Sequence, residues 1–135
     1  MNNLKAWGQT DRVVLTDSIQ VEQITVQPGG YCSIHYHNYK DNFFMVLSGI
    51  LTVRWGWREN AIVTAQVPPQ IEQLSALSSG LQIPAGVLHQ FENLSDKPVR
   101  AVELYRTKPG YTLKPDDIIR FNRGGRHVGN GNGGR

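Results

Sequence analysis

HYHNYKDNFF, residues 35–44, is the stretch from which the fold can be worked out. His35 and His37 are separated by one residue, so on a β-strand both imidazoles point to the same face. Two imidazoles on one face can bind a single metal ion with little rearrangement. Two unrelated surface histidines would give the same pattern, so this stretch alone leaves both interpretations open.

The second half of the chain contains a matching stretch, PAGVLHQFEN, residues 84–93. Pro84 and Gly86 predict a tight turn. This turn delivers His89 to the start of the next strand, where it can meet the first two histidines. The second stretch therefore favours a metal site over a pair of surface histidines.

The apolar residues along the chain alternate with the period of β-strands. SIQVEQITV, residues 18–26, is the clearest case, and CSIHYH, FFMVLSGILTVRW and RAVELYR follow the same pattern. Short strands separated by turn residues predict an all-β sandwich or barrel. KPDDIIRF, residues 114–121, is the exception, and predicts a short C-terminal helix with Pro115 near its start.

A chain of 135 residues is long enough for one domain with its own core. Residues 58–79 contain Pro68-Pro69 and then a Gln/Ser-rich run, which predicts a long excursion between strands. The Gly-rich tail, residues 124–135, has too little apolar surface to offset its ordering entropy, so we expect it to be flexible. We therefore place a single domain at residues 1–123.

Composition narrows the class of protein and its partners. No apolar run reaches the roughly 18 residues of a membrane span, and the polar start MNNLKAWGQTD does not resemble a signal peptide. Cys32 is the only cysteine, which favours a reducing compartment, the cytoplasm. Of the 14 Lys and Arg, nine lie in residues 97–135 against three acids. They are scattered rather than clustered, which argues against nucleic acid as a partner.

The two histidine stretches carry a resemblance to a known superfamily. One series of residues resembles the first cupin motif, apart from the acid of that motif. It is Gly29-x5-His35-x-His37-x4-Asn42-x6-Gly49. The end of the second cupin motif matches Pro84-x-Gly86-x2-His89-x3-Asn93. The resemblance implies a small antiparallel cupin barrel, also called a double-stranded β-helix or jelly roll. Its interior would hold one divalent metal ion, usually iron, manganese, zinc, nickel or cobalt.

Further stretches narrow the resemblance, which runs from about residue 7 to residue 126. They are similar to the cupin domain at the C-terminus of type II mannose-6-phosphate isomerases, usually fused to a mannose-1-phosphate guanylyltransferase. In chain order they are Trp7-Gly8, QVEQITVQPGG, MVLSGILTV, IPAGVLHQFENLSDKP, VELYR and GYTLKPDDIIRFNRGGR. The chain shows no Gly-rich nucleotide loop and is too short for the guanylyltransferase part, so guanylyl transfer is not expected.

The resemblance implies that His35, His37 and His89 bind the metal, with position 42 as the fourth ligand. The family usually has glutamine at position 35 and an acid at position 42, where this chain has His35 and Asn42. Asn42 offers an amide oxygen without charge, so metal affinity should be lower than with a carboxylate. Asp41 is the alternative ligand, although on a regular strand it points away from the face of Asn42. A pocket without metal is the other interpretation.

Glu103 lies on a late strand where the family keeps an acid. A buried carboxylate there can act as a general base, and a partnership with Arg100 or Arg106 is the alternative. Arg106, Lys108 and Arg120 are candidates for binding a substrate phosphate, because guanidinium groups match phosphate oxygens. Scattered surface charge is the alternative interpretation of these three residues.

By resemblance, the chain is expected to act on a small sugar or sugar phosphate as an aldose–ketose isomerase similar to mannose-6-phosphate isomerase. A metal would polarise the carbonyl and hydroxyl groups of the open-chain sugar, and Glu103 would move the proton. One alternative is a non-catalytic carbohydrate-binding or structural cupin with a degenerate metal site. Another is a three-histidine iron dioxygenase.

We also expect a homodimer. Cupins often pair through sheet faces and edges, and exposed strand edges are hazardous unless they are covered. Val53, Trp55 and Trp57 alternate on one face of a strand and are the candidate apolar patch.

Overall fold

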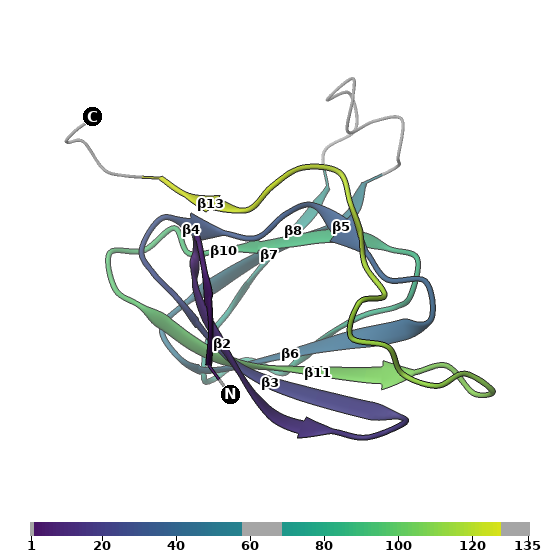
Figure 1. Cartoon of the computed structure of the whole chain (residues 1–135). Coiled ribbons are helices and arrows are strands. Elements are labelled where there is room, and N and C mark those ends of the chain that lie inside the picture. Colours follow the sequence, from purple (N-terminus) through teal and green to yellow (C-terminus); the bar gives the residue numbers. More distant parts are fainter. Residues whose placement is uncertain (1, 58–68, 128–135) are drawn as a thin grey trace.

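The computed structural model describes residues 2–57 and 69–127 of the chain. These residues form two antiparallel β-sheets that face each other across a common interior (Figure 1). The predicted all-β barrel is therefore confirmed. Within this part of the chain, no helix is long and apolar enough to cross a membrane.

Among the described residues, thirteen strands make up the two sheets. The first sheet contains, in spatial order, β1 (Asn2–Lys5), β2 (Gly8–Leu15), β3 (Ile19–Val26), β11 (Val99–Thr107), β6 (Lys40–Ser48) and β9 (Leu81–Ile83). The second contains β12 (Ile119–Arg120), β5 (His35–Tyr36), β10 (Leu88–Glu92), β4 (Gly30–Tyr31), β13 (Gly125–Arg126), β7 (Leu51–Trp57) and β8 (Gln70–Leu74). In the second sheet β7 pairs with both β10 and β8.

The prediction of a C-terminal helix is wrong. Residues 114–121 form a turn, in which the N–H of Asp117 donates to the carbonyl of Lys114 at 3.1 Å, followed by β12. A helix of one or two turns gains little on its own because its nucleus is costly. Pairing of β12 with β5 instead satisfies backbone groups within the sheet.

Two other segments contain more β structure than the sequence predicts. Within the expected excursion at residues 58–79, β8 pairs with β7 along its whole length, and the connecting residues 58–68 lie outside the described part of the chain. Near the C-terminus β13 pairs with β4. The β structure thus extends past the expected domain boundary, and the remainder of the expected tail, residues 128–135, also lies outside the described part.

The inward faces of β3, β11 and β6 divide the interior into an apolar half and a polar half. Side chains alternate along each strand between the interior and the outer face. At one end of these strands the inward residues are apolar, namely Ile24, Val26, Ala101, Val99, Phe44 and Val46. At the other end they are polar, namely Gln20, Glu22, Glu103, Tyr105, Asn42 and Lys40. One set of strands therefore supplies both a hydrophobic core and a polar chamber.

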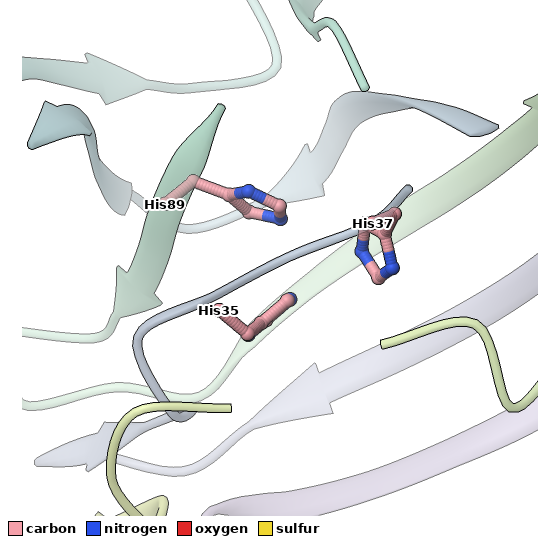
Figure 2. A group of neighbouring side chains, drawn as sticks. All are labelled: His35, His37 and His89. Atoms are coloured by element: carbon pink, nitrogen blue, oxygen red, sulfur yellow. The ribbon is translucent and has the colours of Figure 1, made fainter. Parts of the chain in front are cut away.

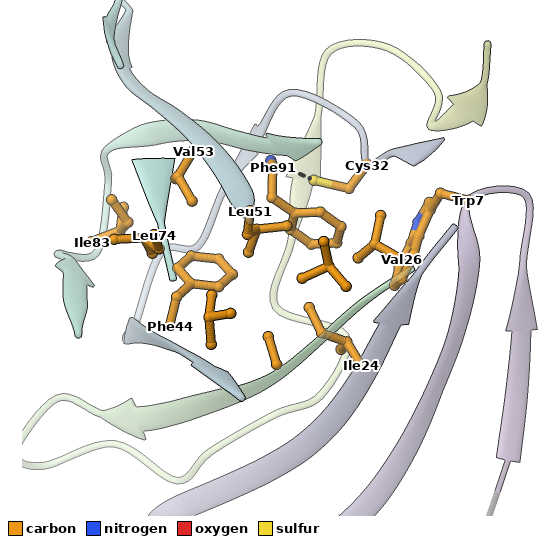
Figure 3. Close-up of a cluster of buried hydrophobic side chains, with 13 residues drawn as sticks. Trp7, Ile24, Val26, Cys32, Phe44, Leu51, Val53, Leu74, Ile83 and Phe91 are labelled. Atoms are coloured by element: carbon orange, nitrogen blue, oxygen red, sulfur yellow. Dashed lines mark hydrogen bonds between the residues drawn. The ribbon is translucent and has the colours of Figure 1, made fainter. Parts of the chain in front are cut away.

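Side chains from both sheets fill the apolar half (Figure 3). The rings of Trp7 and Phe91 meet edge to face, with centroids 4.9 Å apart. Cys32 packs in the same cluster, where its sulfur accepts the N–H of Phe91 at 3.2 Å. Burial raises the pKa of the Cys32 thiol. Cys32 is thus a core residue.

The structure corrects the prediction of an apolar surface patch on β7 at one of its three residues. Val53 is fully buried in the core and offers no surface to a partner. Trp55 packs against the same core from its edge and is half-buried. The homodimer remains a prediction, without Val53 in its interface.

Asn93 fixes the turn between β10 and β11. Its side chain is fully buried, and its Nδ2 donates to the carbonyls of Val26 at 3.0 Å and Lys97 at 2.7 Å. Its Oδ1 accepts the N–H and the hydroxyl of Ser95 at 2.9 and 2.7 Å. The amide therefore uses its full hydrogen-bonding capacity to hold the turn.

Asn93→Ala should lower the free energy of unfolding by about 2–4 kcal/mol, because it removes these hydrogen bonds from a buried position. Denaturant unfolding followed by tryptophan fluorescence measures the change. Asn38→Ala, at an exposed position, is the matched control and should cost less than about 0.5 kcal/mol. Equal effects of the two variants would contradict this role for Asn93.

Candidate metal centre

Three buried histidines meet in the polar half of the barrel. His35 on β5 and His89 on β10 are register partners, and His37 follows β5. The ring centroids are 4.4 Å apart for His35 and His89, 5.0 Å for His35 and His37, and 5.3 Å for His37 and His89. One ring nitrogen of each lies within 4.8 Å of the others. Figure 2 shows the three rings gathered around a common space.

The second ring nitrogen of each histidine, Nδ1, is bonded to a backbone carbonyl. For His35, His37 and His89 these carbonyls belong to Ser33 (2.7 Å), Asp117 (2.7 Å) and Val87 (2.9 Å). A carbonyl only accepts, so each Nδ1 carries the proton and each Nε2 keeps its lone pair. Metal-binding histidines are oriented in this way by their outer partners. The three side chains thus present the correct tautomer for a cation.

Burial keeps the three imidazoles neutral. Desolvation lowers the pKa of His37 to about 3 and the pKa of His89 to about 4. It also holds the pKa of His35 well below its usual value, and repulsion between the rings lowers the pKa of His35 and His37 further. Neutral imidazole is the form that binds metals. The cluster can therefore accept a cation at neutral pH without first losing protons.

Asn42 lies beside this cluster. It is fully buried on β6, with its Nδ2 3.0 Å from Oε2 of Glu103 and 3.4 Å from Nε2 of His89. Its Oδ1 has no hydrogen-bond partner in the described chain, and neither does Nε2 of His37. Buried acceptors are normally satisfied, and a cation would satisfy both. The residues present therefore fit a metal ion.

Asp41, the alternative fourth ligand, has other partners. Its Oδ1 accepts the N–H of Ala85 at 2.9 Å, and its Oδ2 lies 3.6 Å from the guanidinium of Arg106. Its alternation with Asn42 along β6 turns it away from the barrel interior. The structure thus places Asn42, and not Asp41, next to the histidines.

Glu103 lies behind Asn42 on the neighbouring strand β11. Its Oε2 accepts hydrogen bonds from Asn42 at 3.0 Å and from the hydroxyl of Tyr105 at 2.9 Å. Burial raises the pKa of this carboxyl, and the two hydrogen bonds oppose that rise. The expected alternative, a partnership with Arg100 or Arg106, is not found among the hydrogen bonds and ion pairs of the described residues.

A cavity of about 410 Å³ opens beside the histidines. Among the residues that line it are His35, His37, Arg12, Gln20, Glu22, Lys40, Glu103, Tyr105 and Arg120. Its volume suits a sugar-sized ligand. Of the three phosphate-binding candidates, only Arg120 lines this cavity. Arg106 lies over the ring of Phe43, 5.3 Å from its centroid, and Lys108 is exposed elsewhere.

Sequence reasoning missed several polar residues of the cavity wall, among them Arg12, Gln20, Glu22 and Lys40. A usable signal for two of them was the alternation within residues 18–26. Gln20 and Glu22 share a face with Ile24, which belongs to the core, so polar side chains on that face had to lie inside the barrel. The sequence around Lys40 did not indicate that its side chain lies inside the barrel.

Comparison with known proteins identifies the family. The family described as "Mannose-6-phosphate isomerase C-terminal" matches residues 1–123. The chain belongs to this family. Mannose-1-phosphate guanylyltransferase of Klebsiella pneumoniae is 32% identical over 118 residues, which are 87% of this chain and 21% of that protein. Xanthan biosynthesis protein XanB of Xanthomonas campestris pv. campestris is 28% identical over 117 residues, 87% of this chain and 22% of that protein.

The chain thus spans about a fifth of the length of these relatives.

Solved structures show the same fold. Capsular polysaccharide assembling protein CapF from Staphylococcus aureus has a TM-score of 0.72 at 22% identity, covering 89% of this chain and 33% of that chain. Oxalate decarboxylase from Bacillus subtilis has a TM-score of 0.70 at 12% identity, covering 90% and 30%. The predicted cupin fold is confirmed, and the buried histidine cluster within it is consistent with a metal site.

Acid should destabilise the metal-free protein through the three histidines. Folding lowers their pKa below the usual 6.5, so the unfolded chain binds more protons below that pH. The free energy of unfolding should therefore fall as the pH drops from about 6.5 towards 4, by up to about 1.4 kcal/mol per pH unit for each histidine. Thermal unfolding in EDTA between pH 7.5 and pH 5 measures this dependence.

His89→Gln should flatten the pH dependence, because it removes one of the buried groups that must stay neutral. His127→Gln, at an exposed position, is the control and should leave the slope of the wild-type protein unchanged. A slope that is the same in all three proteins would assign the acid sensitivity to other groups.

Asn42→Glu should raise the affinity for Zn²⁺ or Mn²⁺ at least tenfold, about 1.4 kcal/mol. A carboxylate at this position supplies the charge that the amide lacks, at an oxygen–metal distance of about 2.0–2.2 Å. Calorimetric titration of protein without a histidine tag measures the affinity. His89→Ala should abolish binding in both backgrounds.

Asp41→Ala is the matched control for position 42, because it changes the neighbouring residue on the opposite face. We expect less than a twofold change in metal affinity. A greater loss of affinity in Asp41→Ala than in Asn42→Ala would make Asp41 the ligand.

Proposed function

We propose that this chain is a metal-dependent cupin domain that interconverts an aldose phosphate and a ketose phosphate. The observation that carries the proposal is that ring nitrogens of three buried histidines lie within 4.8 Å of one another, beside a cavity that the buried carboxylate of Glu103 also lines. The family description names mannose-6-phosphate isomerase, and the Klebsiella pneumoniae relative is named for a mannose phosphate. Both support a phosphorylated hexose as the substrate class.

His35, His37 and His89 would hold a divalent cation through Nε2, with Oδ1 of Asn42 as the fourth donor. Such a cation supplies Lewis-acid polarisation of the sugar carbonyl and its neighbouring hydroxyl. The Nδ1–H bonds to backbone carbonyls fix the direction of each ring, so the donors need little rearrangement.

Glu103 is the base of this proposal. It would take the proton from the carbon beside the carbonyl and return it to the adjacent carbon, while a hydroxyl proton moves between the two oxygens. Asn42 and Tyr105 both donate to Oε2, and no described residue is hydrogen-bonded to Oε1. These bonds would orient the carboxyl and leave Oε1 for the substrate proton. The raised pKa makes Glu103 a stronger base than an exposed glutamate.

The phosphate of the substrate would lie at the mouth of the cavity. Lys5, Arg12 and Arg120 line the cavity and are exposed. Their charges attract an anion while its hydroxyl groups enter the polar chamber. Arg120 thus remains a phosphate candidate, and Lys5 and Arg12 replace Arg106 and Lys108.

A second candidate function is that of a non-catalytic sugar-binding cupin, and Asn42 is the observation that favours it. Three imidazoles and an amide offset none of the cation's charge, which lowers metal affinity. In that case the cavity would bind a sugar without turnover, and EDTA would not change the binding.

Incubation with D-mannose 6-phosphate and Mn²⁺, Zn²⁺ or Co²⁺ should yield D-fructose 6-phosphate, and EDTA should stop the reaction. Glu103→Gln should lower kcat by about 100-fold or more, while calorimetry should still detect metal binding. Glu72→Gln, exposed on β8, should have wild-type kcat. Wild-type activity should fall at acid pH, because Glu103 must be deprotonated to act as the base.

Lack of turnover with all three metals, together with sugar binding that EDTA leaves unchanged, would contradict the isomerase proposal. It would favour the non-catalytic sugar-binding cupin.

A further inference from the structure

Three buried side-chain nitrogen or oxygen atoms lack a hydrogen-bond partner in the described chain, and all three lie in the polar half of the barrel. They are Oε1 of Gln20, Nε2 of His37 and Oδ1 of Asn42. A cation at the histidine cluster would satisfy the last two. Gln20 requires a different partner.

Gln20 and Asn42 lie on strands that are separated by β11. Both residues are register partners of Tyr105, Gln20 from β3 and Asn42 from β6. Two strand spacings, about 10 Å, therefore separate their backbones. Gln20 lines the same cavity as the histidines and is only 5% exposed.

The orientation of the Gln20 amide is fixed by its neighbours. Its Nε2 donates to Oε2 of Glu22 at 2.9 Å, and Nε of Arg12 donates to the same oxygen at 3.1 Å. A carboxylate paired with a guanidinium accepts only, so the amide nitrogen must face Glu22. The reverse orientation would bring two acceptors together. Oε1 is thus held away from Glu22 without a donor.

Glu22 supplies a second free acceptor next to Gln20. Both of its hydrogen bonds fall on Oε2, and none in the described chain reaches Oε1. Gln20 and Glu22 are alternate residues of β3, so their side chains lie on one face, and both line the cavity. Arg12 anchors the pair from β2. This wall of the cavity therefore contains two acceptor oxygens that have no donor in the described chain.

We propose that Gln20 and Glu22 form a second binding subsite, which recognises the hydroxyl groups of a sugar phosphate at the end remote from the metal. Hydroxyl groups are the donors that two such acceptors require. Two acceptors do not suit an anion, so the phosphate itself would lie at Lys5 and Arg120 of the cavity mouth, because Arg12 is paired with Glu22. This inference rests on the proposed function, because it assumes that the other end of the ligand meets the histidines.

The experiment compares Gln20→Met with Gln23→Met in otherwise intact protein loaded with Zn²⁺. Methionine has a similar length but lacks the amide, and Gln23 lies on the same strand with its side chain on the outer face. The probes are D-mannitol 6-phosphate, which cannot isomerise, and inorganic phosphate. Calorimetry gives both dissociation constants and, separately, the affinity for Zn²⁺.

We expect Gln20→Met to weaken binding of D-mannitol 6-phosphate at least tenfold and Gln23→Met to change it less than twofold. Binding of inorganic phosphate and of Zn²⁺ should stay within twofold of wild type in both variants. The melting temperature of Gln20→Met is measured as well, because the substitution also removes the hydrogen bond from Nε2 of Gln20 to Glu22.

Three results would overturn the subsite. One is a lower melting temperature in Gln20→Met with unchanged affinity for D-mannitol 6-phosphate, which would make Gln20 a support for Glu22. Another is an equal loss of affinity for inorganic phosphate, which would place the phosphate at Gln20. The third is a wild-type protein that binds Zn²⁺ but not D-mannitol 6-phosphate. If the expected losses occur without isomerisation of D-mannose 6-phosphate, the subsite stands and the isomerase proposal falls.

Discussion

The hydrogen bond between each histidine Nδ1 and a backbone carbonyl is the interaction on which the centre depends. Burying three imidazoles together is costly unless each keeps one nitrogen paired and all stay neutral. The three carbonyls come from the chain before His35, from the loop before β12 for His37, and from the chain before His89. The loop before β12 thus helps to shape the centre although it supplies no metal ligand itself.

The strands of the first sheet explain how a small barrel can tolerate so many buried polar groups. The apolar side chains of β3, β11 and β6 pack against the second sheet, and this packing stabilises the frame (Figure 3). The polar side chains of the same strands then project into a cavity at fixed strand spacings. Their positions are set by backbone pairing rather than by loops, which suits a site that must hold its donors apart.

Local rules predicted the strands of the barrel, and the resemblance of the two histidine stretches to the cupin motifs implied that His35, His37 and His89 meet. Alternation with period two identifies the strands, and a turn at Pro84 and Gly86 places His89. The β12 segment could not be predicted in this way, because its partner β5 lies some 80 residues earlier and only tertiary pairing makes it a strand. The same is true of Arg12, whose role depends on the register between β2 and β3.

The hydrogen bond between Asn42 and Glu103 changes what the neutral amide at position 42 implies for metal binding. Asn42 donates to Glu103 at 3.0 Å, so a carboxylate lies one hydrogen bond away from the proposed metal ligand. A charge at that distance still offsets part of the charge of a cation in a buried site, where screening is weak. The cation in turn would lower the pKa of Glu103, against the effect of burial. Metal affinity and the basicity of Glu103 are therefore coupled through Asn42. A substitution at Asn42 or at Glu103 should change both properties.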